Sequence, residues 1–267
     1  MDNKNLSNVL LVGCPRSGTT ILQAILSSHP DVFSLPETHF YPALCSTNPI
    51  LRHLGISTKN AKHIVKDIES SFLLNSNIKC SIFTKYLSSQ YVELLNKITF
   101  NKKCKIWIEK TPQNLWFLKF IKNLTSDLKY IHIEREPKDV IASIHYASTK
   151  YPESWGYQNL NSTTQLWRQS KWINDQYRDN HNHLFCKYEN LVNYPTDEIK
   201  RILLFLNLDF KQNLHQKTLT QRKIISRETD HWTKDIVDGL KKTKSRFYYH
   251  FSKEEQEQVI KAINSEN

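Results

Sequence analysis

The chain has 267 residues, a length that suits one large α/β domain or two small domains. Hydrophobic residues make up 39% and charged residues 24%, an ordinary globular composition that excludes a low-complexity or repeat protein. The formal net charge of +11 favours anionic partners, but the lysines are spread along the chain and no dense basic tract indicates a nucleic-acid-binding arm.

The first predicted elements are a strand, a glycine-bounded loop and a helix. Residues 8–13 form a short apolar run that ends at a glycine, which is typical of a buried parallel strand. Residues 19–28 carry apolar side chains at helical spacing. The next stretch, about 30–57, contains four prolines and is expected to be rich in loops.

Helices and strands then alternate to the end of the chain. The patterns predict helices near 60–74, 81–97, 113–123, 138–148, 163–178 and 189–206, and strands at 105–109, 128–134 and 184–187. The helix at 189–206 is expected to be interrupted near Pro195, and a capping box opens a final helix at Ser252. This alternation predicts an α/β fold, with a P-loop-like parallel sheet flanked by helices on both faces, in a single domain over residues 1–267.

The loop at 13–20 reads G-C-P-R-S-G-T-T and has the glycine spacing of the phosphate-binding G-x-x-x-x-G-K-[ST] motif. Backbone N–H groups before a helix bind phosphate-like anions, and the hydroxyls of Ser17, Thr19 and Thr20 add donors. Thr19 stands where a nucleotide triphosphatase has its lysine, whereas a cation, Arg16, comes earlier in the loop. The loop therefore suits a shorter anion bound without magnesium.

The segment P-R-S-G-T-T, followed by His29-Pro30 and Pro36-Glu37-Thr38, resembles PAPS-dependent sulfotransferases. In motif it is most similar to tyrosylprotein sulfotransferases and related bacterial sulfotransferases. The resemblance implies in-line transfer of a sulfuryl group from PAPS (3'-phosphoadenosine-5'-phosphosulfate) to a hydroxyl or amine, giving PAP and needing no metal. It also implies that Arg16, Ser17, Gly18, Thr19 and Thr20 bind the 5'-phosphosulfate.

A second motif follows the strand at 128–134, where Arg135 comes eight residues before Ser143. It resembles the part of these enzymes that holds the 3'-phosphate, and an arginine at the carboxyl end of a parallel strand is well placed for that role. The alternative is that Arg135 makes only surface ion pairs with Glu134, Glu136 or Asp139.

Two later segments resemble the family more weakly. Residues 186–191 (C-K-Y-E-N-L) are similar to a segment whose tyrosine lies near the nucleotide, so Tyr188 is a candidate contact, or else a core residue at a strand end. The basic stretch 232–246 stands where related enzymes fold a loop over the nucleotide. Lys244 and Arg246 are candidates there, and the sequence does not choose between them.

The catalytic candidates are Arg16, Glu37 and Lys110. Charge develops on the leaving oxygen, so Arg16 and Lys110 are expected beside it. The acceptor must lose a proton, and the resemblance implies that Glu37 takes it. His39 is a rival base, and Pro112 occupies the place where phenol and steroid sulfotransferases carry a histidine.

Three other functions stay open on the sequence: a P-loop kinase, a polyanion-binding module without turnover, and an inactive relative of the sulfotransferases. The expected acceptor is a small-molecule, sugar, lipid or peptide hydroxyl, and no nucleic-acid partner is expected.

Location is the last inference from the sequence. The five cysteines are odd in number and lack C-x-x-C spacing, so neither a disulfide framework nor a zinc site is expected. No stretch has the apolar length of a membrane span, and the polar start does not resemble a signal peptide. These features predict a cytoplasmic protein with reduced thiols.

Overall fold

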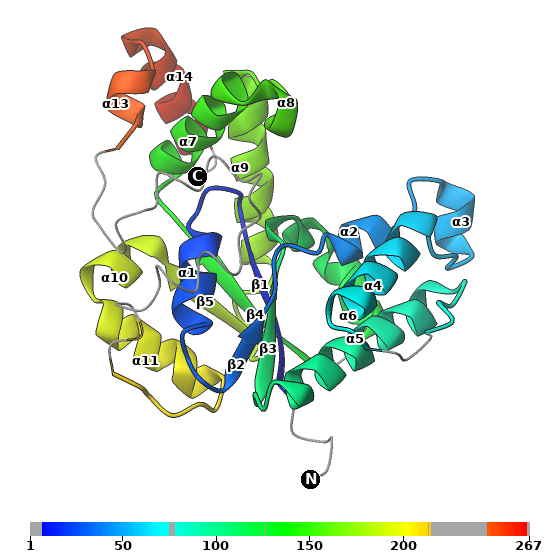
Figure 1. Ribbon diagram of the computed structural model, residues 1–267. Coiled ribbons are helices and arrows are strands. Elements are labelled where there is room, and N and C mark those ends of the chain that lie inside the picture. The colour runs from blue at the N-terminus through cyan, green and yellow to red at the C-terminus, as the bar shows by residue number, and fades with distance from the viewer. Residues whose placement is uncertain (1–6, 75–77, 126, 213, 215–244, 266–267) are drawn as a thin grey trace.

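A computed structural model describes residues 7–74, 78–125, 127–212, 214 and 245–265, arranged around one parallel sheet (Figure 1). Its strand order is β2-β3-β1-β4-β5. The strands are β1 (Ser7–Gly13), β2 (Val32–Ser34), β3 (Ile106–Lys110), β4 (Leu128–Glu134) and β5 (His183–Lys187). All four pairings are parallel, so the five carboxyl ends lie along one edge of the sheet.

The central strand β1 shows why both faces of the sheet are covered. Val9 and Leu11 point to one face and Leu10 and Val12 to the other, and all four side chains are fully buried. Since side chains alternate along a strand, a run that is apolar at every position needs helices on both sides.

Helices form a layer on each face (Figure 1). One layer contains α1 (Thr19–Leu26), α10 (Tyr188–Asn193) and α11 (Pro195–Phe205). The other contains α2 (Phe40–Leu44), α4 (Lys59–Ser71), α5 (Thr84–Asn101), the 3-10 helix Pro112–Phe117 and α6 (Leu118–Leu124), with the short α3 (Pro49–His53) after α2.

A further group of helices lies beyond the carboxyl edge of the sheet, at the top of Figure 1. It consists of α7 (Pro137–Lys150), α8 (Pro152–Trp155), α9 (Leu160–Asp175), α13 (Phe247–His250) and α14 (Lys253–Asn264). The C-terminal end of α9 also reaches the sheet, where Asn174 contacts His132 of β4. Cys14, in the loop after β1, is buried in the apolar cluster of these helices. The loop after β1 is therefore fixed by packing from above as well as from the sheet.

The predicted fold class is confirmed, with differences in the proline-rich stretch. The stretch from about 30 to 57 was expected to be rich in loops, and it also holds the edge strand β2 and the short helices α2 and α3, which were not predicted. These elements are only three to five residues long, too short to show a period in the sequence. The predicted helix at 189–206 is divided into α10 and α11 at Pro195, and Ser252 and Glu255 form the expected capping box.

Candidate functional site

Each of the five strands ends in a segment that carries a predicted site residue. The segments are the loop 13–20 after β1, Glu37 after β2, Lys110 at the end of β3, Arg135 after β4 and Tyr188 after β5. Open α/β sheets bind ligands outside this edge, beside the strand where the chain changes direction. Here that strand is β1, since the chain first adds β2 and β3 on one side of it and then β4 and β5 on the other.

The loop after β1 has the backbone of an anion site. Gly18 has φ of 102° and caps α1 without a side-chain hydrogen bond, so the first N–H groups of that helix are not covered by a capping side chain. Arg16 is also left-handed, with φ of 70°, and the N–H of Ser17 donates to the carbonyl of Cys14 at 3.1 Å. A tight loop before an uncapped helix is the arrangement that binds phosphate-like groups.

Tyr188 packs directly on this loop. A Cβ atom added to Gly18 would lie 2.5 Å from Cδ2 of Tyr188, so only glycine admits the ring at this distance. The guanidinium carbon of Arg135 lies 4.4 Å from the centre of the same ring. Burial raises the pKa of Tyr188. Tyr188 thus links the loop to the second predicted phosphate motif.

The two predicted phosphate motifs meet at Arg16. Its Nε donates to Oγ of Ser143 on α7 at 3.1 Å, although the two residues are 127 positions apart. Arg135 pairs with Asp139 at 3.4 Å, so the ion-pair alternative holds for one of the three carboxylates considered. The Nε atom of Arg135 is nevertheless buried and has no hydrogen-bond partner among the described residues. A donor in that position suits a phosphate oxygen.

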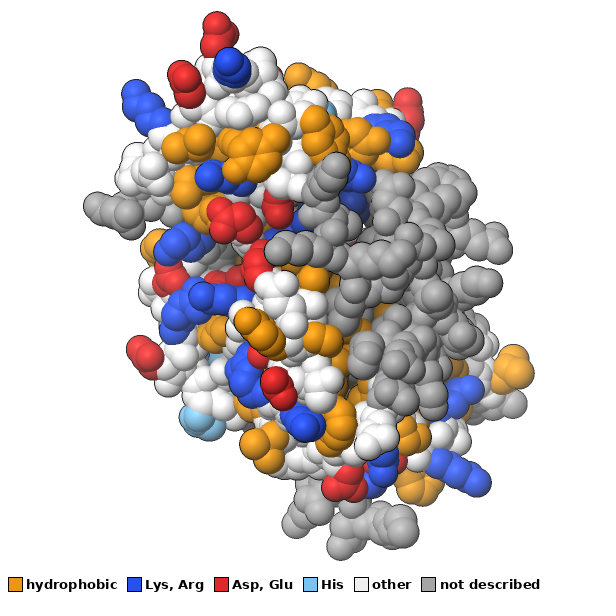
Figure 2. Space-filling model, turned by 90° about the vertical axis from the view of Figure 1, so that its left-hand side faces the viewer, with side chains coloured by type: hydrophobic (Ala, Val, Ile, Leu, Met, Phe, Trp, Pro, Cys, Tyr) orange, Lys and Arg blue, Asp and Glu red, His pale blue; other side chains and the backbone are white. Residues whose placement is uncertain are grey.

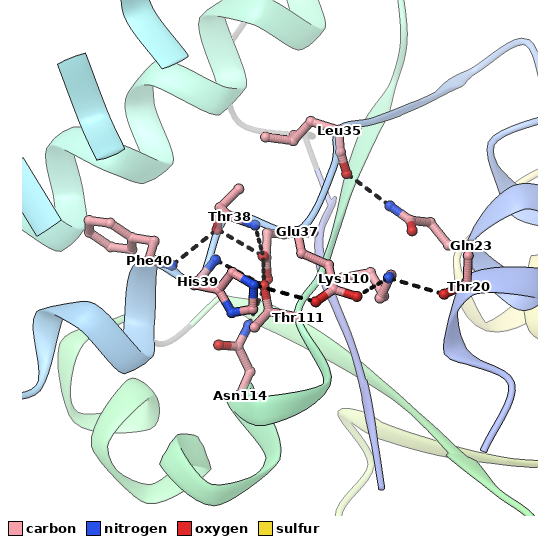
Figure 3. Close-up of polar contacts among 11 residues, drawn as sticks. Thr20, Gln23, Leu35, Glu37, Thr38, His39, Phe40, Lys110, Thr111 and Asn114 are labelled. Carbon is pink, nitrogen blue, oxygen red and sulfur yellow. Dashed lines mark hydrogen bonds and ion pairs between the residues drawn. The ribbon is translucent and has the colours of Figure 1, made fainter. Parts of the chain in front are cut away.

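Lys110 and Glu37 face each other between β3 and the segment after β2 (Figure 3). The Nζ of Lys110 forms an ion pair with Oε1 of Glu37 and donates to Oγ1 of Thr20 at 3.3 Å. The Lys110 side chain is only 4% exposed. One buried ammonium therefore joins the phosphate loop to the candidate base.

His39 lies beside the same carboxylate. Its Nε2 is 3.5 Å from Oε2 of Glu37, and its side chain is 43% exposed against 29% for Glu37. The two candidate bases thus lie side by side, and Glu37 is the one that contacts Lys110.

One group at the site was missed by the sequence reasoning: the fully buried carboxylate of Glu109. It accepts hydrogen bonds from Thr38, Thr111 and Asn114. Burial raises the pKa of Glu109, while the bonds from Thr111 and Thr38 act in the opposite direction. The sequence does hold a signal for it, because Glu109 is a carboxylate at the end of an otherwise apolar predicted strand, directly before Lys110.

Most of the basic stretch 232–246, including Lys244, lies outside the described residues. Within it, Ser245 donates a hydrogen bond to Asp139, the partner of Arg135. The guanidinium of Arg246 lies 4.3 Å from the ring of Tyr146 on α7. Ser245, which was not predicted, is thus the part of this stretch that contacts the second motif.

The surface bears on the polyanion-binding alternative. On the face in Figure 2, which carries α10, α11 and α13, the described lysines and arginines are interspersed with aspartates and glutamates. That face presents no continuous basic patch in its described part. In the described ranges, no helix has the length and apolarity to cross a bilayer, and no three metal-binding side chains come together.

Comparison with known proteins gives a consistent result. Residues 8–212 match the model of the sulfotransferase family. A protein-tyrosine sulfotransferase of Drosophila melanogaster is 24% identical over 214 residues, which are 77% of this chain and 39% of the fly protein. Protein-tyrosine sulfotransferase 1 of Danio rerio is 23% identical over 252 residues, 90% of this chain and 66% of the relative. The chain thus spans less than two thirds of each of these two relatives.

Solved structures agree in fold. The sulfotransferase domain from the curacin biosynthetic pathway has a TM-score of 0.62 at 18% identity and covers 97% of this chain and 98% of its own. Mouse sulfotransferase SULT7A1, solved with PAP, has a TM-score of 0.59 at 15% identity and covers 99% of this chain and 85% of its own.

Proposed function

The chain belongs to the sulfotransferase family, and from this we propose that it transfers a sulfuryl group from PAPS to a hydroxyl or amine of an acceptor, giving PAP. The observation that carries the proposal is the contact of Lys110 with both Thr20 and Glu37. It joins an anion-binding loop, a buried cation and a carboxylate base, which are the three parts that sulfuryl transfer needs.

We propose that the loop after β1 holds the 5'-phosphosulfate through its N–H groups and the hydroxyls of Ser17, Thr19 and Thr20. Arg135 and Ser143 hold the 3'-phosphate. The assignment is supported by the buried Nε of Arg135, which has no hydrogen-bond partner in the described part of the chain, and by the ring of Tyr188 against Gly18. PAPS supplies the sulfuryl group when bound.

In the proposed chemistry, Glu37 takes the proton of the acceptor while the acceptor oxygen or nitrogen attacks the sulfur. Lys110 lies within hydrogen-bond distance of Thr20 in the loop, so its ammonium is placed to stabilise the charge on the leaving 5'-phosphate oxygen. Arg16 is assigned to the same end of the donor, and its bond to Ser143 connects that end to the 3'-phosphate site.

The acceptor is proposed as a small-molecule, sugar, lipid or peptide hydroxyl, without a required metal. The protein-tyrosine relatives support a peptide acceptor. We expect the segments that differ most from the family to determine which class of acceptor binds. We also propose one domain over residues 1–267 and a cytoplasmic location, which the five free thiols support.

The test is sulfuryl transfer from labelled PAPS to a panel with one sugar, one phenol, one aliphatic alcohol and one tyrosine peptide. Lys110→Met is expected to lower transfer by about 100-fold or more, as for loss of one group that stabilises developing charge. Lys105→Met, which removes an exposed ammonium at the other end of the same strand, is the matched control and is expected to retain activity. Absence of both transfer and PAPS consumption, or equal activity of the two variants, would contradict the proposal.

A further inference from the structure

We propose that Glu109 is a positioning residue. Its buried carboxylate holds the segment 37–39 against the end of β3, so that the Glu37 carboxylate meets Lys110. The kinetic part of this inference rests on the proposed function, and the structural part does not.

The carboxylate of Glu109 accepts hydrogen bonds from both segments. Its Oε1 accepts from Oγ1 of Thr38 at 2.9 Å and from Oγ1 of Thr111 at 2.5 Å, with the N–H of Thr38 at 3.4 Å. Its Oε2 accepts from Nδ2 of Asn114 at 2.6 Å. One carboxylate therefore ties the segment after β2 to the segment after β3.

The direction of each bond is fixed by its neighbours. Oγ1 of Thr111 accepts from the N–H of His39 at 3.2 Å, so its own hydrogen goes to Glu109. Oγ1 of Thr38 likewise accepts from the N–H of Phe40 at 3.2 Å and lies 3.1 Å from the hydroxyl of Tyr91, which can donate to it; its own hydrogen then goes to the carboxylate of Glu109. The backbone on both sides of His39 is thus attached to Glu109 through two threonine hydroxyls.

The carboxylate accepts at both oxygens. All the contacts above are donors to Glu109, and no ion pair among the described residues involves it. A glutamine in its place would put an NH₂ group at one oxygen, which would either lose the bonds from the two threonines at Oε1 or require the amide of Asn114 to turn at Oε2. The fully buried carboxylate and its donors are therefore matched.

The held segment needs such an attachment. His39 has a left-handed backbone, with φ of 54°, which is strained for a residue other than glycine. Glu37 comes two residues before it and bears the contact with Lys110. When the bonds to Glu109 are lost, the segment can relax at His39, and the Glu37 carboxylate then leaves its position.

The first test is amide hydrogen exchange, which needs no acceptor. Amides 38–40 are expected to exchange at least tenfold faster in Glu109→Gln than in the parent protein. Glu198→Gln is the matched control, since it neutralises a buried carboxylate that pairs with Arg201 on α11, and it should leave these amides unchanged. Unchanged exchange in Glu109→Gln would overturn the proposal.

A milder pair of variants covers the case in which Glu109→Gln does not fold. Thr111→Val removes the hydroxyl between His39 and Glu109, whereas Thr111→Ser keeps it. Faster exchange is expected in the first and parent-like exchange in the second. Equal exchange in the two would overturn the proposal.

The second test separates positioning from donor binding. Thr111→Val is expected to lower kcat for sulfuryl transfer at least tenfold, with PAP affinity within about twofold of the parent and activity restored in Thr111→Ser. A loss of PAP affinity equal to the loss of kcat would overturn the positioning role. If neither the parent protein nor any variant transfers sulfuryl groups but exchange at 38–40 still responds, the proposed function fails and the attachment by Glu109 stands.

Discussion

Gly18 offers a sharp test of the loop geometry. The change to alanine adds one methyl group at a residue with φ of 102°, and that methyl would lie 2.5 Å from Cδ2 of Tyr188. Carbon atoms in contact are normally about 3.5–4.0 Å apart, so the overlap is on the order of 1 Å. The ring and the loop therefore have to move apart.

Two costs add in this variant. A left-handed backbone costs a residue with a side chain about 1–2 kcal/mol, and overpacking costs about 1–3 kcal/mol. Gly18→Ala is thus expected to lower the free energy of unfolding by about 2–5 kcal/mol. Gly55→Ala is the control for the backbone cost, because Gly55 also has a positive φ, of 63°, and its added Cβ would meet only Oγ1 of Thr84, at an ordinary contact distance of 3.5 Å.

The assay is urea unfolding of both variants, with the parent protein measured alongside. Gly18→Ala should lose about 1–3 kcal/mol more than Gly55→Ala, the share assigned to overpacking. In a Tyr188→Ala background, Gly18→Ala should lose that much less than it does in the parent, because the overlapping ring is absent. Equal losses in the two alanine variants, or the same loss from Gly18→Ala with and without the ring of Tyr188, would refute the packing of Tyr188 on the loop.

Three further predictions concern the site and the sheet. Glu37→Gln should lower sulfuryl transfer by about 10²–10⁴-fold, as for loss of a general base, and His39→Gln should retain most of it; the reverse result in steady-state assays would assign the base to His39. Ser143→Ala should weaken PAP binding by about 10- to 150-fold in calorimetry, which corresponds to about 1.5–3 kcal/mol for a hydrogen bond to a charged group. Burial lowers the pKa of His132 to about 3 and that of His183 to about 4, against 6.5, so the unfolded chain binds more protons below pH 6.5. The free energy of unfolding should therefore fall as the pH decreases from 6.5 to 5, and His183→Phe should reduce this slope in urea unfolding.

The sequence was most informative where local patterns decide the structure. The apolar run before Gly13 and the helical spacing after Gly18 are local signals, and they predicted the strand, loop and helix at the site. Arg135 could be placed for the same reason, because it directly follows a recognisable strand. The strand β2 was not predicted, because its three residues lie between Pro30 and Pro36 and are too few to show an alternation of apolar and polar side chains.

Contacts between distant segments could not be predicted in this way. Glu37 and Lys110 are 73 residues apart, and they meet because β2, which was not predicted, pairs with the predicted strand β3. Glu109 was assigned to a strand, but its role depends on which face of β3 it occupies and on Thr38 lying opposite. The bond of Arg16 to Ser143 likewise depends on how α7 packs over the loop, which no local pattern encodes.

The central claim is that the carboxyl edge of the sheet binds the donor nucleotide. It is tested most directly by calorimetric titration with PAP in the absence of magnesium, beside ATP with magnesium, using Arg135→Ala and, as a control, Lys171→Ala on the exposed side of α9. We predict micromolar binding of PAP that is lost in Arg135→Ala, retained in Lys171→Ala, and much tighter than binding of ATP. Absence of PAP binding would contradict the claim. Tight binding of ATP with magnesium that is unchanged in Arg135→Ala would also contradict it and would favour a kinase instead.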